Sequence, residues 1–165
     1  DIFPKIGLKP PVAVHHHMLL GLQFQARGEK GVERKIAMKM SKSNPNSAIF
    51  MTDTKEEVIE KFKRAYCPEG KEEDNPVLEY AKYIVFEKFK EIFIERPARF
   101  GGDVIVKSYD ELKDLFIGKK LHPMDLKTAV AGKINELMEP VREHFAKNNK
   151  ARKLAEKVRS YEVTR

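Results

Sequence analysis

The chain has 165 residues, of which 41% are hydrophobic and 35% charged, a composition typical of a soluble globular protein. No apolar run approaches the ~18 residues that a bilayer span needs, and Asp1-Ile2-Phe3-Pro4 does not begin a signal peptide, so we expect no membrane association. Cys67 is the single cysteine, which excludes an internal disulfide and favours a reducing, cytoplasmic location.

The net charge of +7 is unevenly distributed. Residues 1–50 carry 8 lysines and arginines against 3 aspartates and glutamates, residues 144–165 carry 7 against 2, and the middle carries 17 against 20. Two basic ends favour an anionic partner that is contacted at more than one place. A solvated, lysine-rich surface explains the same distribution equally well.

The first fifty residues read as the end of an α/β domain. Pro10-Pro11 leads into Val12-Ala13-Val14, a β-branched apolar run that predicts one buried strand. One strand cannot stand alone, so we expect its neighbours to lie outside this chain, which would make the chain a fragment. Residues 25–47 are rich in Gly, Lys, Ser and Asn and predict a long loop, which in a compact domain is usually functional or disordered.

From residue 54 onward the sequence predicts helices. Thr54 and Glu57 form a capping box before an apolar face that extends to Tyr66. Asn75-Pro76 starts the next helix as N-cap and first residue, and its apolar residues extend to Phe93.

The last third continues this pattern. Residues 100–103 predict a turn and residues 104–106 a short strand. Ser108 and Glu111 form a second capping box. A final helical stretch from about residue 123 to beyond 159 is predicted to bend at Pro140.

The sharpest motif is Lys39-Met40-Ser41-Lys42-Ser43. Two lysines three residues apart, with hydroxyls between and after them, suit a polyphosphate, because ammonium groups can follow phosphate charge and hydroxyls can bond phosphate oxygens. The alternative is a basic solvent-exposed loop, which explains most K-x-x-K sequences.

The whole motif, K-M-S-K-S, resembles the second signature of class I aminoacyl-tRNA synthetases, and its continuation through Phe50 resembles the tyrosyl and tryptophanyl branch. Further segments, over nearly the whole chain, resemble the tyrosyl-tRNA synthetases of the archaeal and eukaryotic type: Ala65-Tyr66-Cys67-Pro68, Arg96-Pro97, Phe100-Gly101-Gly102-Asp103, Ser108-Tyr109 and Leu121-His122-Pro123-Met124-Asp125-Leu126-Lys127.

The resemblance implies a division into two parts. Residues 1–53 would be the end of a Rossmann-like catalytic domain, an α/β fragment with its last strand and the signature loop, and residues 54–165 a mainly α-helical anticodon-binding domain. The implied activity is ATP-dependent formation of tyrosyl adenylate and transfer to tRNA(Tyr). Mg²⁺ is expected with ATP, without a metal site built by the protein, and the complete enzyme is expected to be a homodimer.

The resemblance also implies roles for individual residues. Lys39 and Lys42 would be catalytic, stabilising the leaving pyrophosphate, and Met40, Ser41 and Ser43 would bind ATP. In the anticodon pocket Phe100 would stack on the first anticodon base and Asp125 would recognise that base, a guanine. The remaining residues implied at or beside this pocket are His122, Pro123, Met124, Lys127, Cys67 and Pro68.

Stacking on an aromatic and hydrogen bonding to the Watson–Crick edge are how proteins read single-stranded RNA. Residue by residue, simpler interpretations exist. Phe100 could be a core aromatic, although the adjacent glycines favour an exposed turn. Asp125 could be a first-turn acid that complements the helix dipole, and without the resemblance this explanation is the stronger one.

Two alternatives to a tyrosine enzyme remain at this stage: a tryptophanyl-tRNA synthetase fragment and a non-catalytic tRNA-binding module. The 165 residues contain no H-x-G-H motif, the first class I signature, so we expect this part to be inactive without a preceding half. His15, His16 and His17 are expected to line the active site or to pack. Adjacent residues on a strand point to opposite faces, so they are not expected to bind a metal.

Overall fold

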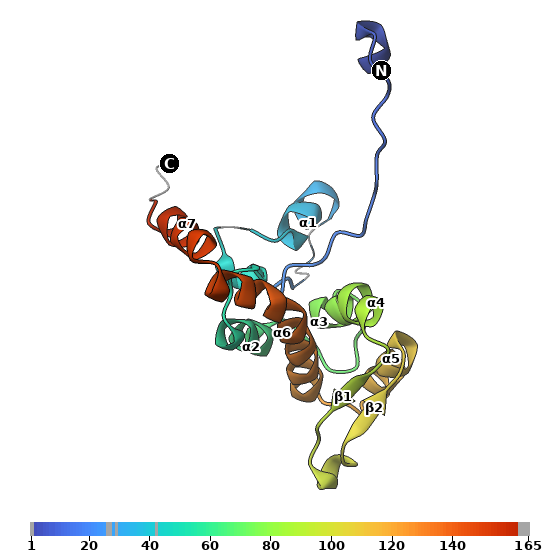
Figure 1. Cartoon of the computed structure of the whole chain (residues 1–165). Helices are drawn as coiled ribbons and strands as arrows, with labels where there is room; N and C mark the ends of the chain where they lie inside the picture. Colours follow the sequence, from blue (N-terminus) through green and yellow to red (C-terminus); the bar gives the residue numbers. More distant parts are fainter. Residues whose placement is uncertain (1, 26–27, 29, 42, 162–165) are drawn as a thin grey trace.

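A computed structural model describes residues 2–25, 28, 30–41 and 43–161 (Figure 1). The helices are α1 Gly31–Met38, α2 Lys55–Arg64, α3 Pro76–Tyr80, α4 Phe86–Lys88, α5 Tyr109–Ile117, α6 Pro123–Lys147 and α7 Asn149–Arg159. A π-helical turn, Ala81–Val85, joins α3 to α4, and 3₁₀ turns lie at Phe3–Ile6, Pro45–Ser47 and Ala98–Phe100. The strands β1 Ile92–Ile94 and β2 Val104–Val106 pair in antiparallel register, Ile92 opposite Val106.

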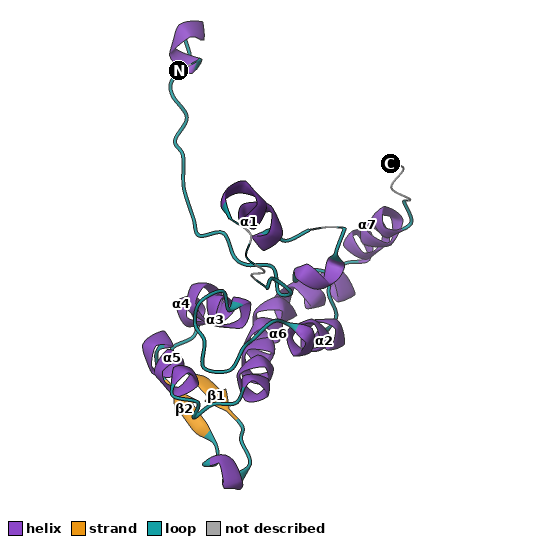
Figure 2. Ribbon diagram, turned by 180° about the vertical axis from the view of Figure 1, so that it is seen from behind, coloured by secondary structure: helices purple, strands orange, loops and turns teal. Residues whose placement is uncertain are grey.

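The long helix α6 organises the fold. It packs against α2, α3 and β1 (Figure 2), and its buried residues include Leu126, Val130 and Ile134. α2 contributes the buried Val58 and Phe62 to the same core. Among the helices that the structure describes, none has the length and apolar character that a bilayer span requires.

The predicted helix starts before α2 and α3 are confirmed. The Thr54 hydroxyl accepts a hydrogen bond from the Glu57 N–H (3.1 Å), and the Glu57 carboxylate accepts one from the Thr54 N–H (2.7 Å), which makes a reciprocal capping box. Asn75 caps α3, with Pro76 in its first turn.

The second predicted capping box forms only in part. The Ser108 hydroxyl accepts the Glu111 N–H, but the Glu111 carboxylate accepts the N–H of Lys107, one residue earlier than expected. The final helical stretch is interrupted at Asn148, a break that was not predicted, while Pro140, where the bend is predicted, lies within α6. The Asn148 side chain caps α7 by accepting the Ala151 N–H (3.0 Å), and this supports a new helix start at that point.

The predicted N-terminal strand is wrong for this chain. Val12 and Val14 are 92% and 87% exposed, and no strand pairs with them in the part of the chain that the structure describes. Figure 1 shows the segment extending away from the body of the molecule. A strand depends on hydrogen bonds to a neighbour, so an apolar run without a partner remains unpaired. The described residues of 1–53 thus contain helix and loop in place of the α/β element expected there.

Two other boundaries also differ from the predictions. The loop expected over 25–47 contains α1, because residues 33–38 are mostly good helix formers and only the flanks are rich in Gly and Ser. The helix expected to reach Phe93 ends at Lys88, and Ile92–Ile94 forms β1. Its burial alternates, with Phe93 half-exposed between two buried isoleucines. That two-residue period is typical of a strand, and it adds a small sheet to the part predicted as helical.

Candidate functional site

Three of the predicted anticodon-binding residues, Phe100, His122 and Asp125, line one pocket of about 780 Å³. The pocket is formed by the tip of the β1–β2 hairpin, the end of α5, the start of α6 and Glu69 in the loop between α2 and α3. These segments are separated in sequence and are brought together by the fold. A volume of this size is in the usual range for ligand sites.

Phe100 lies at the hairpin tip and is 60% exposed. It ends the 3₁₀ turn Ala98–Phe100, and Gly101 and Gly102 follow with φ of 99° and 71°. Both glycines adopt the left-handed region that side chains disfavour, so the chain can reverse tightly and leave the aromatic ring exposed. The Arg99 guanidinium lies 4.9 Å from the ring centre. An exposed ring at such a turn is available for stacking.

His122 and Asp125 are contributed by the start of α6. His122 is the N-cap, and its Nδ1 accepts the Met124 N–H (3.1 Å). In the neutral ring the proton is then on Nε2, which leaves Nε2–H as a donor. Asp125 lies in the first turn, where a carboxylate also complements the helix dipole. The pocket therefore presents a ring, an imidazole donor and a carboxylate acceptor.

The other five predicted pocket residues, Pro123, Met124, Lys127, Cys67 and Pro68, do not line this pocket. The Lys127 Nζ donates to the Lys63 carbonyl (3.0 Å), which directs it toward α2. Burial raises the pKa of the Cys67 thiol, which accepts a hydrogen bond from the Asn75 amide (3.5 Å). These five residues are neighbours of the pocket in sequence, since Pro123 and Met124 lie between His122 and Asp125 and Pro68 precedes the pocket residue Glu69, but their side chains are not part of its lining.

Sequence reasoning assigned no role to Arg96, Lys119 or Lys120, three basic residues that line the pocket. Lys119 is the residue after the α5 C-cap and has φ of 55°. The helix end is closed by hydrogen bonds from the Lys119 N–H to Phe116 and from the Lys120 N–H to Leu115, a geometry that normally places glycine where Lys119 lies. A lysine in that strained position is the kind of signal that marks a functional site.

The signature loop follows α1 directly. Lys39 is the exposed C-cap of α1, and Met40 packs against the core. The loop then turns back at Ser41 and Asn44, which form an isolated β-bridge. The Ser41 Oγ accepts the Ser43 N–H (3.2 Å). Lys42, the second predicted catalytic lysine, lies outside the described residues.

The Ser47 side chain forms hydrogen bonds to both ends of this turn. Its Oγ accepts the Ser41 N–H (3.0 Å) and donates to the Asn44 carbonyl (2.7 Å). The Ser47 carbonyl in turn accepts the Leu22 N–H. The serine side chain thus connects the backbones of Ser41 and Asn44.

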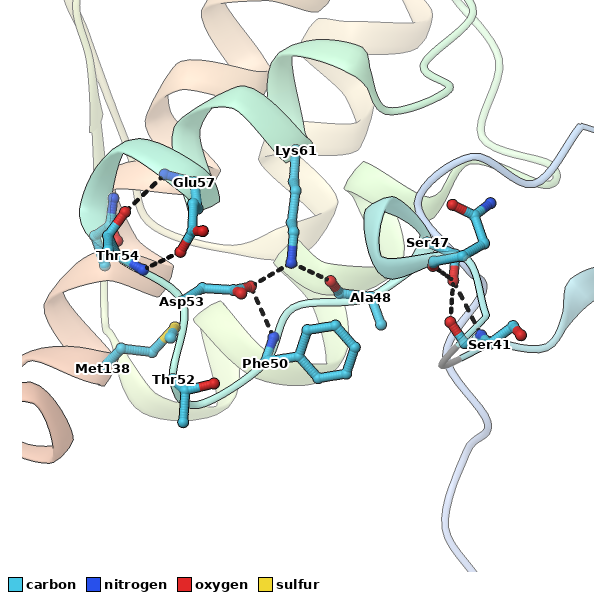
Figure 3. A network of polar contacts seen from close by, with 12 residues as sticks. Ser41, Ser47, Ala48, Phe50, Thr52, Asp53, Thr54, Glu57, Lys61 and Met138 are labelled. Carbon is cyan, nitrogen blue, oxygen red and sulfur yellow. Dashed lines mark hydrogen bonds and ion pairs between the residues drawn. The ribbon is translucent and has the colours of Figure 1, made fainter. Parts of the chain in front are cut away.

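A buried ion pair joins the segment after the loop to α2 (Figure 3). The Lys61 Nζ lies 2.6 Å from the Asp53 Oδ2 and donates to the Ala48 carbonyl (3.0 Å), while the same Asp53 oxygen accepts the Phe50 N–H (2.8 Å). The side chains of Lys61 and Asp53 are 8% and 9% exposed. Sequence reasoning missed this pair, because an Asp and a Lys eight residues apart on either side of a helix start carry no local signal.

Arg142 and His17 each join segments that are distant in the sequence. Arg142 on α6 donates from Nε to the Asp53 carbonyl (3.1 Å) and from Nη2 to the Asn135 side chain (2.6 Å). The His17 ring stacks on Tyr83 with centroids 4.1 Å apart, and its Nε2 lies 3.2 Å from the Glu79 carboxylate. These contacts agree with packing for His17, one of the two roles expected for the histidine run. His15 and His16 are exposed.

Comparison with known proteins identifies tyrosine–tRNA ligases among the relatives of this chain. The chain is 48% identical over 161 residues to a tyrosine–tRNA ligase of Thermococcus sibiricus and 42% identical over 170 residues to one of Saccharolobus islandicus. These alignments cover 94% and 100% of this chain but 42% and 47% of the relatives, so the chain spans just under half of their length.

Solved structures give the same result. A tyrosyl-tRNA synthetase from Pyrococcus horikoshii, complexed with L-tyrosine, superposes with a TM-score of 0.75 at 44% identity, over 85% of this chain and 39% of that one. A tyrosyl-tRNA synthetase of Leishmania major, complexed with tyrosinol, gives 0.77 at 35% identity, over 99% and 28%. The family described as tRNA synthetases class I (W and Y) matches residues 31–139. Since this match covers more than half of the chain, the chain belongs to the class I tRNA synthetases of the W and Y family, and its relatives there are tyrosyl-tRNA synthetases of the archaeal type.

Proposed function

We infer that this chain is the part of a tyrosine–tRNA ligase that handles the nucleotide phosphates and reads the anticodon. The complete enzyme would join tyrosine to ATP as an adenylate and then transfer the tyrosyl group to tRNA(Tyr). We expect it to act as a homodimer in the cytoplasm. Residues 1–53 would contribute the signature loop and residues 54–165 the anticodon-binding domain.

The observation that carries this proposal is the convergence of Phe100, His122 and Asp125 on one pocket. A guanine edge offers N1–H and N2–H₂ donors, which one carboxylate can accept together. An exposed ring can stack on the base, which contributes ~1–3 kcal/mol. Recognition of unstacked bases by an aromatic and by groups on the base edge is the usual mode for single-stranded RNA.

The signature loop supports the catalytic half of the proposal. Lys39 is exposed at the end of α1, and the nearby Ser41 turn is held by Ser47. A lysine there can follow charge onto a leaving pyrophosphate, and Lys42 would supply the second ammonium group. Within the described residues no cluster of three or more His, Cys, Asp or Glu could hold a metal. We expect magnesium to enter bound to the ATP phosphates.

The test is binding of the 165-residue chain to anticodon stem-loops that carry each of the four bases at the first anticodon position. Asp125→Ala should narrow the differences among bases, because the carboxylate accepts donors that the other bases lack there. Phe100→Ala should weaken binding to all four similarly, since every base has a face to stack. Asp110→Ala is the matched control: Asp110 is also a first-turn acid, in α5, but it lies outside the pocket.

The control separates base reading from helix stabilisation. If Asp125→Ala and Asp110→Ala preserve the same order and spread of affinities, Asp125 only complements its helix dipole and the anticodon assignment is wrong. An aminoacylation assay with the full-length enzyme decides between tyrosine and tryptophan, the other amino acid that this family activates. Charging with tryptophan in preference to tyrosine would overturn the substrate assignment.

A further inference from the structure

Arg96 connects two sides of the pocket lined by Phe100, His122 and Asp125, which we call the base pocket. Its backbone N–H donates to the Asp103 carboxylate (2.9 Å), which closes the hairpin between β1 and β2. Its Nε donates to the Gly102 carbonyl (2.8 Å), next to the Phe100 tip. Its Nη1 donates to the Lys120 carbonyl (2.6 Å), in the turn that leads into α6. One guanidinium therefore holds the segments that carry the ring and the carboxylate.

The hairpin needs such a connection. Each strand has three residues, and a two-stranded ribbon of that length is marginally stable by itself. At its tip Phe100 is 60% exposed, so burial does not fix the ring. A Cβ on Gly101 would lie 3.6 Å from the Arg96 Nη2, so the guanidinium lies directly against the tip backbone.

We propose that Arg96 is a positioning residue for base recognition: it sets the distance between the stacking ring of Phe100 and the reading carboxylate of Asp125. A nucleobase that stacks on the ring presents its edge to the carboxylate only if both sides keep their spacing. Arg96 acts through these two residues and is not assigned a contact with the base. The proposal rests on the proposed anticodon function of the pocket.

The contacts require arginine. The guanidinium is planar and presents its donors in fixed directions, so Nε and Nη1 reach two carbonyls at once. The single ammonium group of a lysine on a flexible stem cannot reproduce this pair. Arg96→Lys therefore keeps the charge and loses the connection, which separates positioning from attraction of the RNA backbone.

The experiment measures affinities for the four stem-loops at two salt concentrations. Arg96→Lys and Arg96→Met should both lower the affinity for the guanine loop by about tenfold, as expected for loss of one or two hydrogen bonds. The other three loops should lose less, so discrimination shrinks. Arg99→Met is the matched control: it removes a neighbouring charge that lies over the Phe100 ring and should weaken all four loops alike. In a Phe100→Ala background, Arg96→Met should cost much less, because the ring that it positions is gone.

A second readout does not depend on RNA. The chain contains no tryptophan, so Phe100→Trp introduces a single tryptophan at the tip, which can be excited at wavelengths that the five tyrosines do not absorb. Adding Arg96→Lys should lower its fluorescence anisotropy without RNA, whereas adding Arg99→Met should not. Thermal unfolding checks that each variant is folded. If Arg96→Met does not fold, the comparison uses Arg96→Lys alone.

Three results would overturn the proposal. Equal weakening of all four loops by Arg96→Lys would make Arg96 a general contributor to stability or charge. Full additivity with Phe100→Ala would show that the two residues act independently, and unchanged anisotropy would show that the tip is held by other contacts. Failure of the anticodon function looks different: Asp125→Ala would then leave base preference unchanged, while the anisotropy would still report whether Arg96 holds the tip.

Discussion

The buried pair Lys61–Asp53 makes a strong prediction about stability. Lys61→Met fills nearly the same space but removes the ammonium partner of the Asp53 carboxylate, which is 9% exposed and keeps the Phe50 N–H as its one hydrogen-bond donor among the described residues. The Ala48 carbonyl also loses the Lys61 donor. Removing one partner of a buried ion pair typically costs about 3–5 kcal/mol, because the other charge remains desolvated. In a chain of this size each kcal/mol lowers Tm by about 2–4 °C, so we expect a fall of roughly 6–20 °C.

The assay is thermal and urea unfolding followed by far-UV circular dichroism. Lys63→Met is the matched control, because Lys63 is on the same helix but exposed, with an ion pair to Glu60 at 3.4 Å, and should cost less than about 0.5 kcal/mol. The double variant Asp53→Asn/Lys61→Met should be more stable than Lys61→Met alone, since the amide oxygen still accepts the Phe50 N–H and no charge is buried. If Lys61→Met costs no more than Lys63→Met, or if the double variant is the less stable, the pair does not anchor this segment.

Three further predictions concern other sites. Burial raises the pKa of Tyr80 from its ordinary 10 to about 12, so the free energy of unfolding should fall as the pH rises from 10 through 12. In urea titrations at alkaline pH, Tyr80→Phe should make this decline less steep. An unchanged slope would contradict the prediction. Lys119→Gly should leave Tm unchanged or raise it, because glycine adopts the left-handed φ of 55° without strain. The same substitution should weaken binding to the stem-loop and reduce the salt dependence of that binding. Unchanged affinity and salt dependence would show that Lys119 is remote from RNA phosphate. In the full-length enzyme, Lys39→Ala and Lys42→Ala should slow ATP–pyrophosphate exchange on the order of 10²-fold with little change in tyrosine binding; a normal exchange rate would remove that lysine from the mechanism.

Structural features that depend on neighbouring residues could be predicted from the sequence. The capping box at Thr54 and the Asn75-Pro76 helix start form as predicted, because each depends on residues within a few positions of one another. The strand at residues 104–106 was predicted from its run of β-branched residues, although its partner at residues 92–94 was not. Family membership followed from the signature and the downstream segments, and the comparisons confirm it.

Contacts between residues that are far apart in the sequence could not be predicted. Whether Val12–Val14 pairs as a strand depends on a neighbour that local sequence does not specify, and Ile92–Ile94 becomes a strand because residues 104–106 lie beside it. The candidate pocket shows the same limit. Phe100 and Asp125 could be proposed from the family resemblance, but the Arg96 contacts with Gly102 and Lys120 join residues up to 24 positions apart. Assignment of catalytic and anticodon roles stays a prediction.

The helix α6 has one further consequence, for insertions and deletions. Asp125 lies in its first turn and Arg142 near its end, so a single helix separates the pocket lined by Phe100 and Asp125 from the segment that follows the signature loop. Seventeen residues of helix measure about 25 Å, and each added or lost residue would shift the far end by about 1.5 Å and rotate it by about 100°. Substitutions on the exposed face of α6 are then tolerable, whereas a change in its length would turn Arg142 away from Asp53. The length of α6 fixes the distance and the relative orientation of Asp125 and Arg142. Among related proteins we expect the number of residues between these two positions to vary far less than their identity.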